Sequence, residues 1–322
     1  MEHPPMTTNE PTRSLPAASS FARVWKRLLK EKYLFLLLLP GLLYFIVYRY
    51  VPMVGITIAF KDYSPFLGFA DSPWVGFKHF RTLLGSSEVV QVLWNTLAIS
   101  FLQIVFAFPA PIVLALLLNE VRSQTYKRIV QSIVYLPHFL SWVVVVGIVF
   151  IFFRNDGIVN DVLRIYFGAE EPIRFLTEPG WFRPFIVAEV IWKEVGWGTI
   201  IFLAALSGVD PHLYEAATID GASRWKQMWH VTLPAIRSTI VILLILRLGD
   251  VLDTGFEQIW LQLNAFNMGV GNTLDTYVYY KGIQQSDYSF STAVGLFKGL
   301  IGLILVVGAN KLAKRFGEEG VY

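Results

Sequence analysis

Several charged side chains of this sequence lie inside long apolar stretches, where charge is costly. A charged group at the centre of a membrane-spanning helix costs at least about 2.5–3.5 kcal/mol, so it marks a functional site unless a partner neutralises it. These stretches are 184–206 with Glu189, Lys193 and Glu194, 236–259 with Arg247, Asp250, Asp253 and Glu257, and 291–312 with Lys298. We therefore expect a polar path for a substrate, with the three basic residues beside it.

The same charges have a second interpretation, in which they pair and hold helices together. Glu189 and Lys193 are four residues apart and share one helical face, so they can form an ion pair. Arg247 and Asp250 are three residues apart and can do the same. Lys298 has no acidic partner within its own stretch, which favours the path for this residue. Because a base at this depth needs a compensating anion, the path interpretation predicts an anionic substrate.

Several kinds of chemistry are excluded or disfavoured by the sequence. The chain contains no cysteine, so disulfides, thiol catalysis and cysteine-ligated zinc are ruled out. It contains neither a GxxxxGK[ST] phosphate-binding loop nor an HExxH motif, so we expect no ATP hydrolysis, no metal site and no cofactor on this chain. His138 stands alone in an apolar context, and we interpret it as a structural residue.

The composition indicates a membrane protein built of helices. Hydrophobic residues make up 54% of the 322 residues and charged residues 16%, and the mean hydropathy is +0.51. Ordinary soluble domains carry about 25% charged residues. Six apolar stretches each reach the roughly 20 residues that a helix needs to cross the hydrocarbon, so we predict an all-α membrane fold with six spans. The predicted spans are Tyr33–Val51, Val92–Leu118, Ile129–Phe153, Pro184–Leu206, Ile236–Ile259 and Ser291–Leu312.

The spans lie within a predicted membrane domain, 33–315, and both ends of the chain are predicted to be cytoplasmic. Residues 1–20 are rich in Pro, Ser and Thr, which predicts a disordered tail. Residues 21–32 are basic with apolar residues at helical spacing, which favours an interfacial helix on an anionic membrane. Lys and Arg concentrate before the first span and after the second, fourth and sixth, and basic loops face the cytoplasm. Residues 316–322 are then a short cytoplasmic tail.

The predicted cytoplasmic segment 207–237 carries signals for two helices with a break between them. Asp210 can cap the first helix, and Gly221 can end it in a left-handed conformation. Ser223 can cap the second helix, and Pro234 directly precedes the fifth span. On these signals alone, the segment is an amphipathic pair of helices that rests on the bilayer surface.

The residues of this segment resemble the EAA loop of permease subunits from binding-protein-dependent ABC importers. The family pattern is Glu-Ala-Ala, three residues, Gly, nine residues, Ile, one residue, Leu-Pro. The matching residues are Glu215, Ala216, Ala217, Gly221, Leu233 and Pro234, with Val231 in place of Ile and with Asp220 also typical. Further blocks are similar to permeases that import oligosaccharides or polysaccharide fragments: YVPMVGITIAFKDYSP (50–65), DTGFEQIW (253–260), TLDTYVYYKGI (273–283), DYSFSTAVGLFK (287–298) and ANKLAKR (309–315).

The resemblance implies a function, a location and a set of partners. It implies a non-catalytic subunit in a bacterial inner membrane that forms half of the path for a carbohydrate, including acidic ones such as alginate. It implies a second permease subunit, expected to be a different chain, two cytoplasmic ATPase subunits that hold ATP and Mg, and an extracytoplasmic solute-binding protein. Segment 207–237 would then form a coupling helix against an ATPase, between the fourth and fifth spans. Lipid surrounds the chain, and nucleic acid is not expected.

Aromatic side chains are further candidates for a carbohydrate path, because sugars stack on aromatic faces through their C–H groups. The candidates are Trp192, Trp197, Tyr277, Tyr279 and Tyr280. An interfacial aromatic belt and a lipid-facing core account better for most of these residues.

Two functions from other classes are weighed against the importer. A proton-coupled secondary transporter would use Glu189, Asp250 or Asp253 as a proton relay and would need no ATPase. The EAA pattern argues against it. An intramembrane enzyme would need a nucleophile with a base or a metal centre, and the sequence contains neither arrangement.

Overall fold

The structure is a computed structural model that describes residues 30–317, 320 and 321. The predicted tail 1–20 and nearly all of the predicted interfacial helix 21–32 lie outside the described residues, as do 318, 319 and 322 of the final tail. Throughout the described part, the regular elements are helices, in agreement with the all-α prediction.

Four helices of the described chain are long and apolar enough to cross a membrane. They are Lys32–Phe60, Ser87–Glu120, Trp142–Phe167 and Tyr288–Arg315. A fifth candidate is the pair Arg224–Ala235 and Arg237–Gly249, which is bent by 58°. The predicted fourth span falls within a further continuous helix of 29 residues, Pro179–Ser207, which carries Glu189, Lys193 and Glu194 within that span.

The chain divides into two compact units, Met1–Ile56 and Thr57–Tyr322. The described part of the first unit is one helical run, and none of its α2 residues is buried. This run comprises α2 (Lys32–Phe45), η1 (Ile46–Tyr50) and η2 (Val51–Phe60), of which η2 continues into the second unit.

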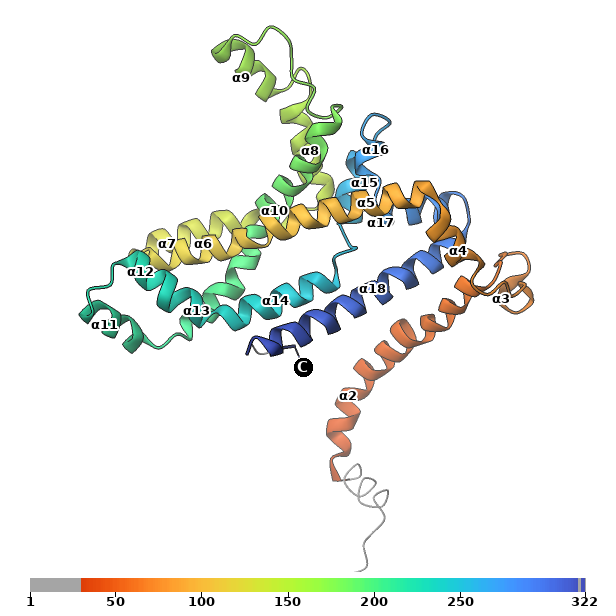
Figure 1. Ribbon diagram of the computed structural model, residues 1–322, viewed down its shortest axis with the longest axis horizontal. Coiled ribbons are helices and arrows are strands. Elements are labelled where there is room, and N and C mark those ends of the chain that lie inside the picture. The colour runs from red at the N-terminus through yellow and green to blue at the C-terminus, as the bar shows by residue number, and fades with distance from the viewer. Residues whose placement is uncertain (1–29, 318–319, 322) are drawn as a thin grey trace, which may run out of the picture. The chain divides into compact units, whose positions relative to one another are not determined.

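The second unit contains the remaining helices. In Figure 1, α14 and α18 run side by side, α6 and α7 lie along α10, and α11 and α12 lie at the opposite end of α14 from α15. The elements are α3 (Gly68–Asp71), α4 (Lys78–Gly85), α5 (Ser87–Leu102), η3 (Gln103–Ala107), α6 (Pro109–Glu120), α7 (Gln124–Tyr135), η4 (Leu136–Phe139), α8 (Trp142–Phe153), α9 (Ile158–Phe167), α10 (Pro179–Ser207), α11 (Pro211–Ile219), α12 (Arg224–Gln227), η5 (Met228–Thr232), α13 (Leu233–Ala235), α14 (Arg237–Gly249), α15 (Phe256–Gln262), α16 (Met268–Gly271), α17 (Leu274–Tyr279), η6 (Tyr280–Gln284) and α18 (Tyr288–Arg315).

Glycines allow the helices of this unit to approach closely. A Cβ added at Gly196 of α10 would lie 2.0 Å from the Val134 carbonyl oxygen of α7. A Cβ added at Gly302 of α18 would lie 2.5 Å from the Gly249 carbonyl oxygen of α14. Small residues at such crossings bring backbones together, which is how helices pack in lipid.

The predicted third span is not one continuous helix. The helical run from α7 ends with η4 at Phe139, and α8 begins at Trp142 after two residues of extended backbone. The Ser141 side chain caps α8 by accepting a hydrogen bond from the Val144 amide, 3.4 Å away. The overall apolar composition of the stretch did not reveal this break.

The prediction that Ile236–Ile259 is one helix is also wrong. Helix α14 ends at Gly249 and α15 begins at Phe256, after Gly255 at a positive φ of 91°. The side chain of Ser100 donates to the Val251 carbonyl, and that of Gln103 to the Thr254 carbonyl. These side chains satisfy carbonyls that a continuous helix would satisfy itself. The four charges of this stretch therefore do not share a single helical face.

Candidate functional site

A cavity of about 490 Å³ lies at the break between α14 and α15. We call it the path cavity. Its lining comes from five parts of the chain: the η3–α6 junction, α8, α10, the end of α14, and the break with α15. The lining residues are Gln103, Ala107, Phe108, Trp142, Val190, Arg247, Asp250, Asp253, Thr254, Gly255 and Gln258.

Arg247 lies in the path cavity, as the path interpretation predicts, but its partner differs from the predicted one. Its guanidinium donates a hydrogen bond to the Gln103 side-chain oxygen. No ion pair joins Arg247 to Asp250, so this predicted pairing is wrong among the described residues. The π-helical turn η3 begins at Gln103. Such bulges often occur at functional sites.

The path cavity carries more acidic than basic side chains. Asp250 and Asp253 line it together with a single base, Arg247. Neutral hydrogen-bonding groups come from Gln103, Gln258 and Thr254, and aromatic faces from Trp142 and Phe108. A mixture of aromatic faces and hydrogen-bonding groups can hold a polar ring compound, since such sites combine apolar walls with a few convergent polar groups.

Glu189 lies behind the path cavity and does not pair with Lys193. Its side chain is 5% exposed, and its Oε2 atom accepts hydrogen bonds from the amides of Gln258 and Gln262, each at 2.7 Å. The predicted Glu189–Lys193 pair is wrong: the amides of α15 bond one oxygen of this carboxylate, and the Lys193 ammonium bonds the His138 carbonyl instead. Glu189 thus joins α10 to α15 and holds Gln258 at the cavity.

Lys193 is buried and does not line the path cavity. Its ammonium donates to the His138 carbonyl oxygen at 2.6 Å and lies 3.4 Å from Glu194 Oε1. The Glu194 Oε2 atom in turn lies 2.7 Å from Nδ1 of His138. These contacts agree with a structural role for His138, and they remove Lys193 from the residues that face the path.

Lys298 is also paired. It forms an ion pair with Asp275 of α17, and the two side chains are 19% and 17% exposed. The sequence showed no partner because Asp275 precedes Lys298 by 23 residues, on another helix. An unpaired base at this position was the reason to place Lys298 in the path, and that reason no longer holds.

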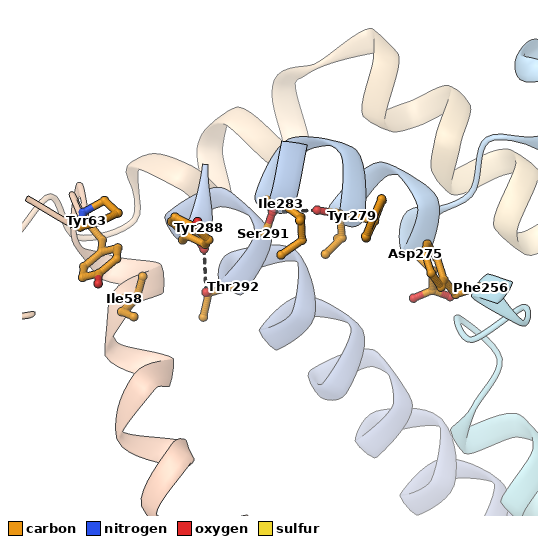
Figure 2. A pocket seen from close by; sticks show the side chains of 12 residues that line it. Ile58, Tyr63, Phe256, Asp275, Tyr279, Ile283, Tyr288, Ser291 and Thr292 are labelled. Atoms are coloured by element: carbon orange, nitrogen blue, oxygen red, sulfur yellow. Dashed lines mark hydrogen bonds between the residues drawn. The ribbon is translucent and has the colours of Figure 1, made fainter. Parts of the chain in front are cut away.

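Asp275 lines a second cavity of about 760 Å³, shown in Figure 2. Its other side chains are mainly aromatic or aliphatic, including Tyr63, Tyr279 and Tyr288. The hydroxyls of Ser291 and Thr292 donate to backbone carbonyls of Val278 and Tyr288. With these polar groups already bonded within the chain, the second cavity offers a less polar surface than the path cavity.

The predicted aromatic candidates lie outside the path cavity. Trp192 and Trp197 are 46% and 47% exposed, and Trp197 stacks on His138. Tyr277 is 4% exposed and donates to Glu88 Oε2 at 3.1 Å. Burial raises the pKa of the Tyr277 hydroxyl, and the neighbouring Glu88 carboxylate raises it further. Tyr277 is therefore buried, its hydroxyl is bonded to Glu88, and it lines neither cavity.

Eight of the eleven lining residues were missed from the sequence, among them Gln103, Trp142, Phe108 and Gln258. A signal existed for one of them. Thr96, Ser100 and Gln103 follow helical spacing within the apolar stretch 92–118, and all three are buried. Polar residues on one face of an apolar helix indicate a face turned toward protein or water rather than lipid.

The surface segment 207–237 has the predicted break between two helices. The Asp210 side chain caps α11 by accepting a hydrogen bond from the His212 amide at 2.9 Å. The Ser223 side chain caps α12 by accepting one from the Lys226 amide. Gly221 has φ of +74° and separates the two helices. The Tyr214 hydroxyl of α11 donates a hydrogen bond to the Thr232 hydroxyl of η5 at 3.1 Å and so joins the parts of the segment before and after Gly221.

The EAA residues of this segment lie on two helices. Glu215, Ala216 and Ala217 belong to α11, whereas Leu233 and Pro234 belong to α13. Large apolar side chains around them are exposed: Ile219 is 87%, Trp225 67% and Trp229 59% exposed. An apolar surface of this kind is typical of a face that another surface covers.

Comparisons with known proteins agree with this architecture. Residues 107–317 match the family described as binding-protein-dependent transport system inner membrane component. Protein LplB of Bacillus subtilis is 52% identical over the whole of both chains. The polygalacturonan/rhamnogalacturonan transport system permease protein YteP of the same organism is 54% identical over 93% of each chain.

A solved structure of a bacterial alginate ABC transporter, in complex with an alginate pentasaccharide-bound periplasmic protein, contains a similar chain. That chain is 40% identical, with a TM-score of 0.85, and the match covers 93% of this chain and all of the other. The family match spans most of the residues that form both the path cavity and the surface segment 207–237. This chain therefore belongs to the family of binding-protein-dependent transport system inner membrane components.

Proposed function

We propose that this chain forms half of the translocation path of an ABC importer for oligosaccharides released from acidic polysaccharides. The chain is a sugar importer permease subunit by its family and relatives. The observation that carries the proposed path is the cavity at the α14–α15 break, where Trp142 and Phe108 lie beside Gln103, Gln258 and Arg247. Sugars need both aromatic faces and hydrogen-bonding partners, and this cavity supplies both.

The acidic substrate class is supported by similarity rather than by the buried bases. Two relatives bear on it: the polygalacturonan/rhamnogalacturonan permease at 54% identity and the alginate transporter chain at 40% identity. Lys193 and Lys298 each have a carboxylate partner within this chain, so neither needs a substrate anion. Arg247 is the basic residue of the path cavity that could bind a sugar carboxylate. Asp250 and Asp253 line the same cavity and would repel that carboxylate.

Six spans with both chain ends in the cytoplasm are part of the proposal. The four long apolar helices, α14 of the bent pair and the charged helix α10 would supply them. Segment 207–237 would then lie on the cytoplasmic side, with Glu215, Asp220 and Gly221 at a coupling helix that docks on an ATPase subunit. Its exposed Ile219 and Trp225 support a covered surface there.

The proposed assembly contains a second permease, two ATPase subunits and a solute-binding protein. This chain would hydrolyse no ATP, and ATP with Mg would be held by the ATPase subunits. A periplasmic protein in complex with the similar alginate transporter supports the binding-protein partner. The comparisons support this importer and not a proton-coupled secondary transporter.

Purification of the tagged chain from host membranes, with identification of the bound chains, tests the proposal. We expect an ATPase and a second permease to co-purify. Cells in which the gene is deleted should lose uptake of oligosaccharides from a polygalacturonan or alginate digest. Uptake that persists at the wild-type rate for both digests, or a chain that purifies without any ATPase, would contradict it.

A further inference from the structure

Trp142 has two sets of neighbours, one in the path cavity and one buried. It is the first residue of α8, directly after the Ser141 cap, and its side chain lines the path cavity. The ammonium of Lys193 lies over the indole, 5.5 Å from the ring centroid. A cation within about 6 Å of a tryptophan face is attracted by the negative potential of the ring. The indole is therefore held by a group that does not itself line the cavity.

Lys193 is fixed by contacts to the break that precedes α8. Its side chain is 7% exposed, and it donates to the His138 carbonyl of η4 at 2.6 Å. Glu194 approaches its ammonium at 3.4 Å and also contacts the His138 ring at 2.7 Å. The His138 ring lies parallel to Trp197, with centroids 4.5 Å apart. The Lys193 ammonium is thus held by a hydrogen bond to the His138 carbonyl and by the nearby carboxylate of Glu194.

The backbone around these contacts is packed closely. A Cβ at Gly196, three residues after Lys193, would lie 2.0 Å from the Val134 carbonyl oxygen. Helix α10 therefore presses directly on the end of α7, just before the break. The position of Trp142 depends on α10 through this contact and through Lys193.

From this geometry we infer that Trp142 is a stacking surface for a sugar ring in the path cavity and that Lys193 is its positioning residue. The inference rests on the proposed function. It assigns Lys193 a role in transport although its charge never meets the substrate. The aromatic face supplies contact with sugar C–H groups, since the face of the ring is negative, and Lys193 fixes the plane of that face.

The test uses host cells in which each variant replaces the native chain. The maximal uptake rate of oligosaccharides from a polygalacturonan or alginate digest is measured by mass spectrometry. We expect Trp142→Leu to lower this rate roughly tenfold, which corresponds to about 1.4 kcal/mol, whereas Trp142→Phe keeps most of it. Trp192→Leu is the matched control, because Trp192 is half-exposed on α10 and lines neither cavity. It should transport at close to the wild-type rate.

A double-mutant cycle separates positioning from general stability. We expect Lys193→Met to lower uptake by a similar factor in the wild type and to add little in the Trp142→Leu background. Lys193→Arg should keep most of the wild-type uptake rate, because a guanidinium can also lie over an indole. Variant amounts in the membrane are measured alongside by immunoblot, and rates are expressed per assembled complex.

Three outcomes overturn the inference. They are equal uptake by Trp142→Leu and wild type, equal losses in Trp142→Phe and Trp142→Leu, and losses of Lys193→Met and Trp142→Leu that simply multiply. If Lys193→Met fails to assemble, the Lys193→Arg and Trp142 variants still decide the matter. A wild-type chain whose deletion leaves uptake of both digests unchanged would instead reject the proposed function.

Discussion

The surface segment 207–237 and the path cavity are built in opposite ways. The segment is defined by contacts between residues close in sequence: Asp210 accepts from the His212 amide two residues away, and Tyr214 reaches Thr232 across 18 residues. The path cavity depends on contacts such as Gln103 with Arg247, across 144 residues, and Ser100 with Val251, across 151. Local signals were therefore sufficient for the first region and insufficient for the second.

The difference also concerns exposure. The segment exposes Ile219 and Trp225, and its helices are capped by its own side chains Asp210 and Ser223. In the cavity, the broken helix leaves carbonyls that only side chains from another helix can satisfy. A change in the segment should therefore act mainly on the proposed docking to an ATPase subunit, whereas a change at the cavity should disturb the proposed path and the stability of the fold together.

The largest effect is expected from Gly221→Val, which tests whether the segment depends on one backbone conformation. Gly221 has φ of +74°, and an added Cβ there meets no atom within 4 Å, so the whole cost is backbone strain. Such strain costs about 1–3 kcal/mol, and we expect uptake to fall below a tenth of the wild-type rate while the chain still inserts. Gly208→Ala is the control, since Gly208 has φ of −87°. Equal uptake in both variants would show that the turn is not needed.

A smaller loss is expected from Gln103→Leu, which tests whether the cavity depends on its distant partner. The leucine leaves the Arg247 guanidinium and the Thr254 carbonyl without this partner. Each unsatisfied buried group costs about 1–3 kcal/mol, so we expect roughly tenfold slower uptake and a lower melting temperature of the purified complex. Gln103→Glu keeps an acceptor for Arg247 and should lose less. A leucine variant with wild-type uptake and stability would contradict the role of Gln103.

The smallest effect is expected from Asp210→Ala, which removes one local cap of the segment. Loss of an N-cap costs about 1 kcal/mol. We expect uptake to fall by a few-fold with unchanged stability of the membrane helices, as measured by thermal unfolding of the purified complex. Asp210→Asn should behave like the wild type because asparagine also caps helices well. If Asp210→Ala melts the membrane domain as strongly as Gln103→Leu does, the contrast between the two regions is lost.

Sequence patterns determined the helical class, the long apolar helices and the two-helix form of segment 207–237. Hydrophobic composition and length select membrane helices, because lipid offers backbone groups no other partner. Asp210, Gly221 and Ser223 act on neighbours within a few residues, so their caps and turn could be predicted directly. The family also followed from this segment, since its pattern lies in consecutive residues.

Only the tertiary structure decided which charges meet. Asp275 reaches Lys298, Gln258 reaches Glu189 and Gln103 reaches Arg247, each from a different helix. Spacing along one helix cannot show these pairs, because it reports which residues share a face and not what that face contacts. The break at 250–255 was missed for the same reason. A broken helix in an apolar stretch is stable only where another part of the chain satisfies its freed polar groups. Which part does so depends on the tertiary structure and cannot be read from the broken stretch itself.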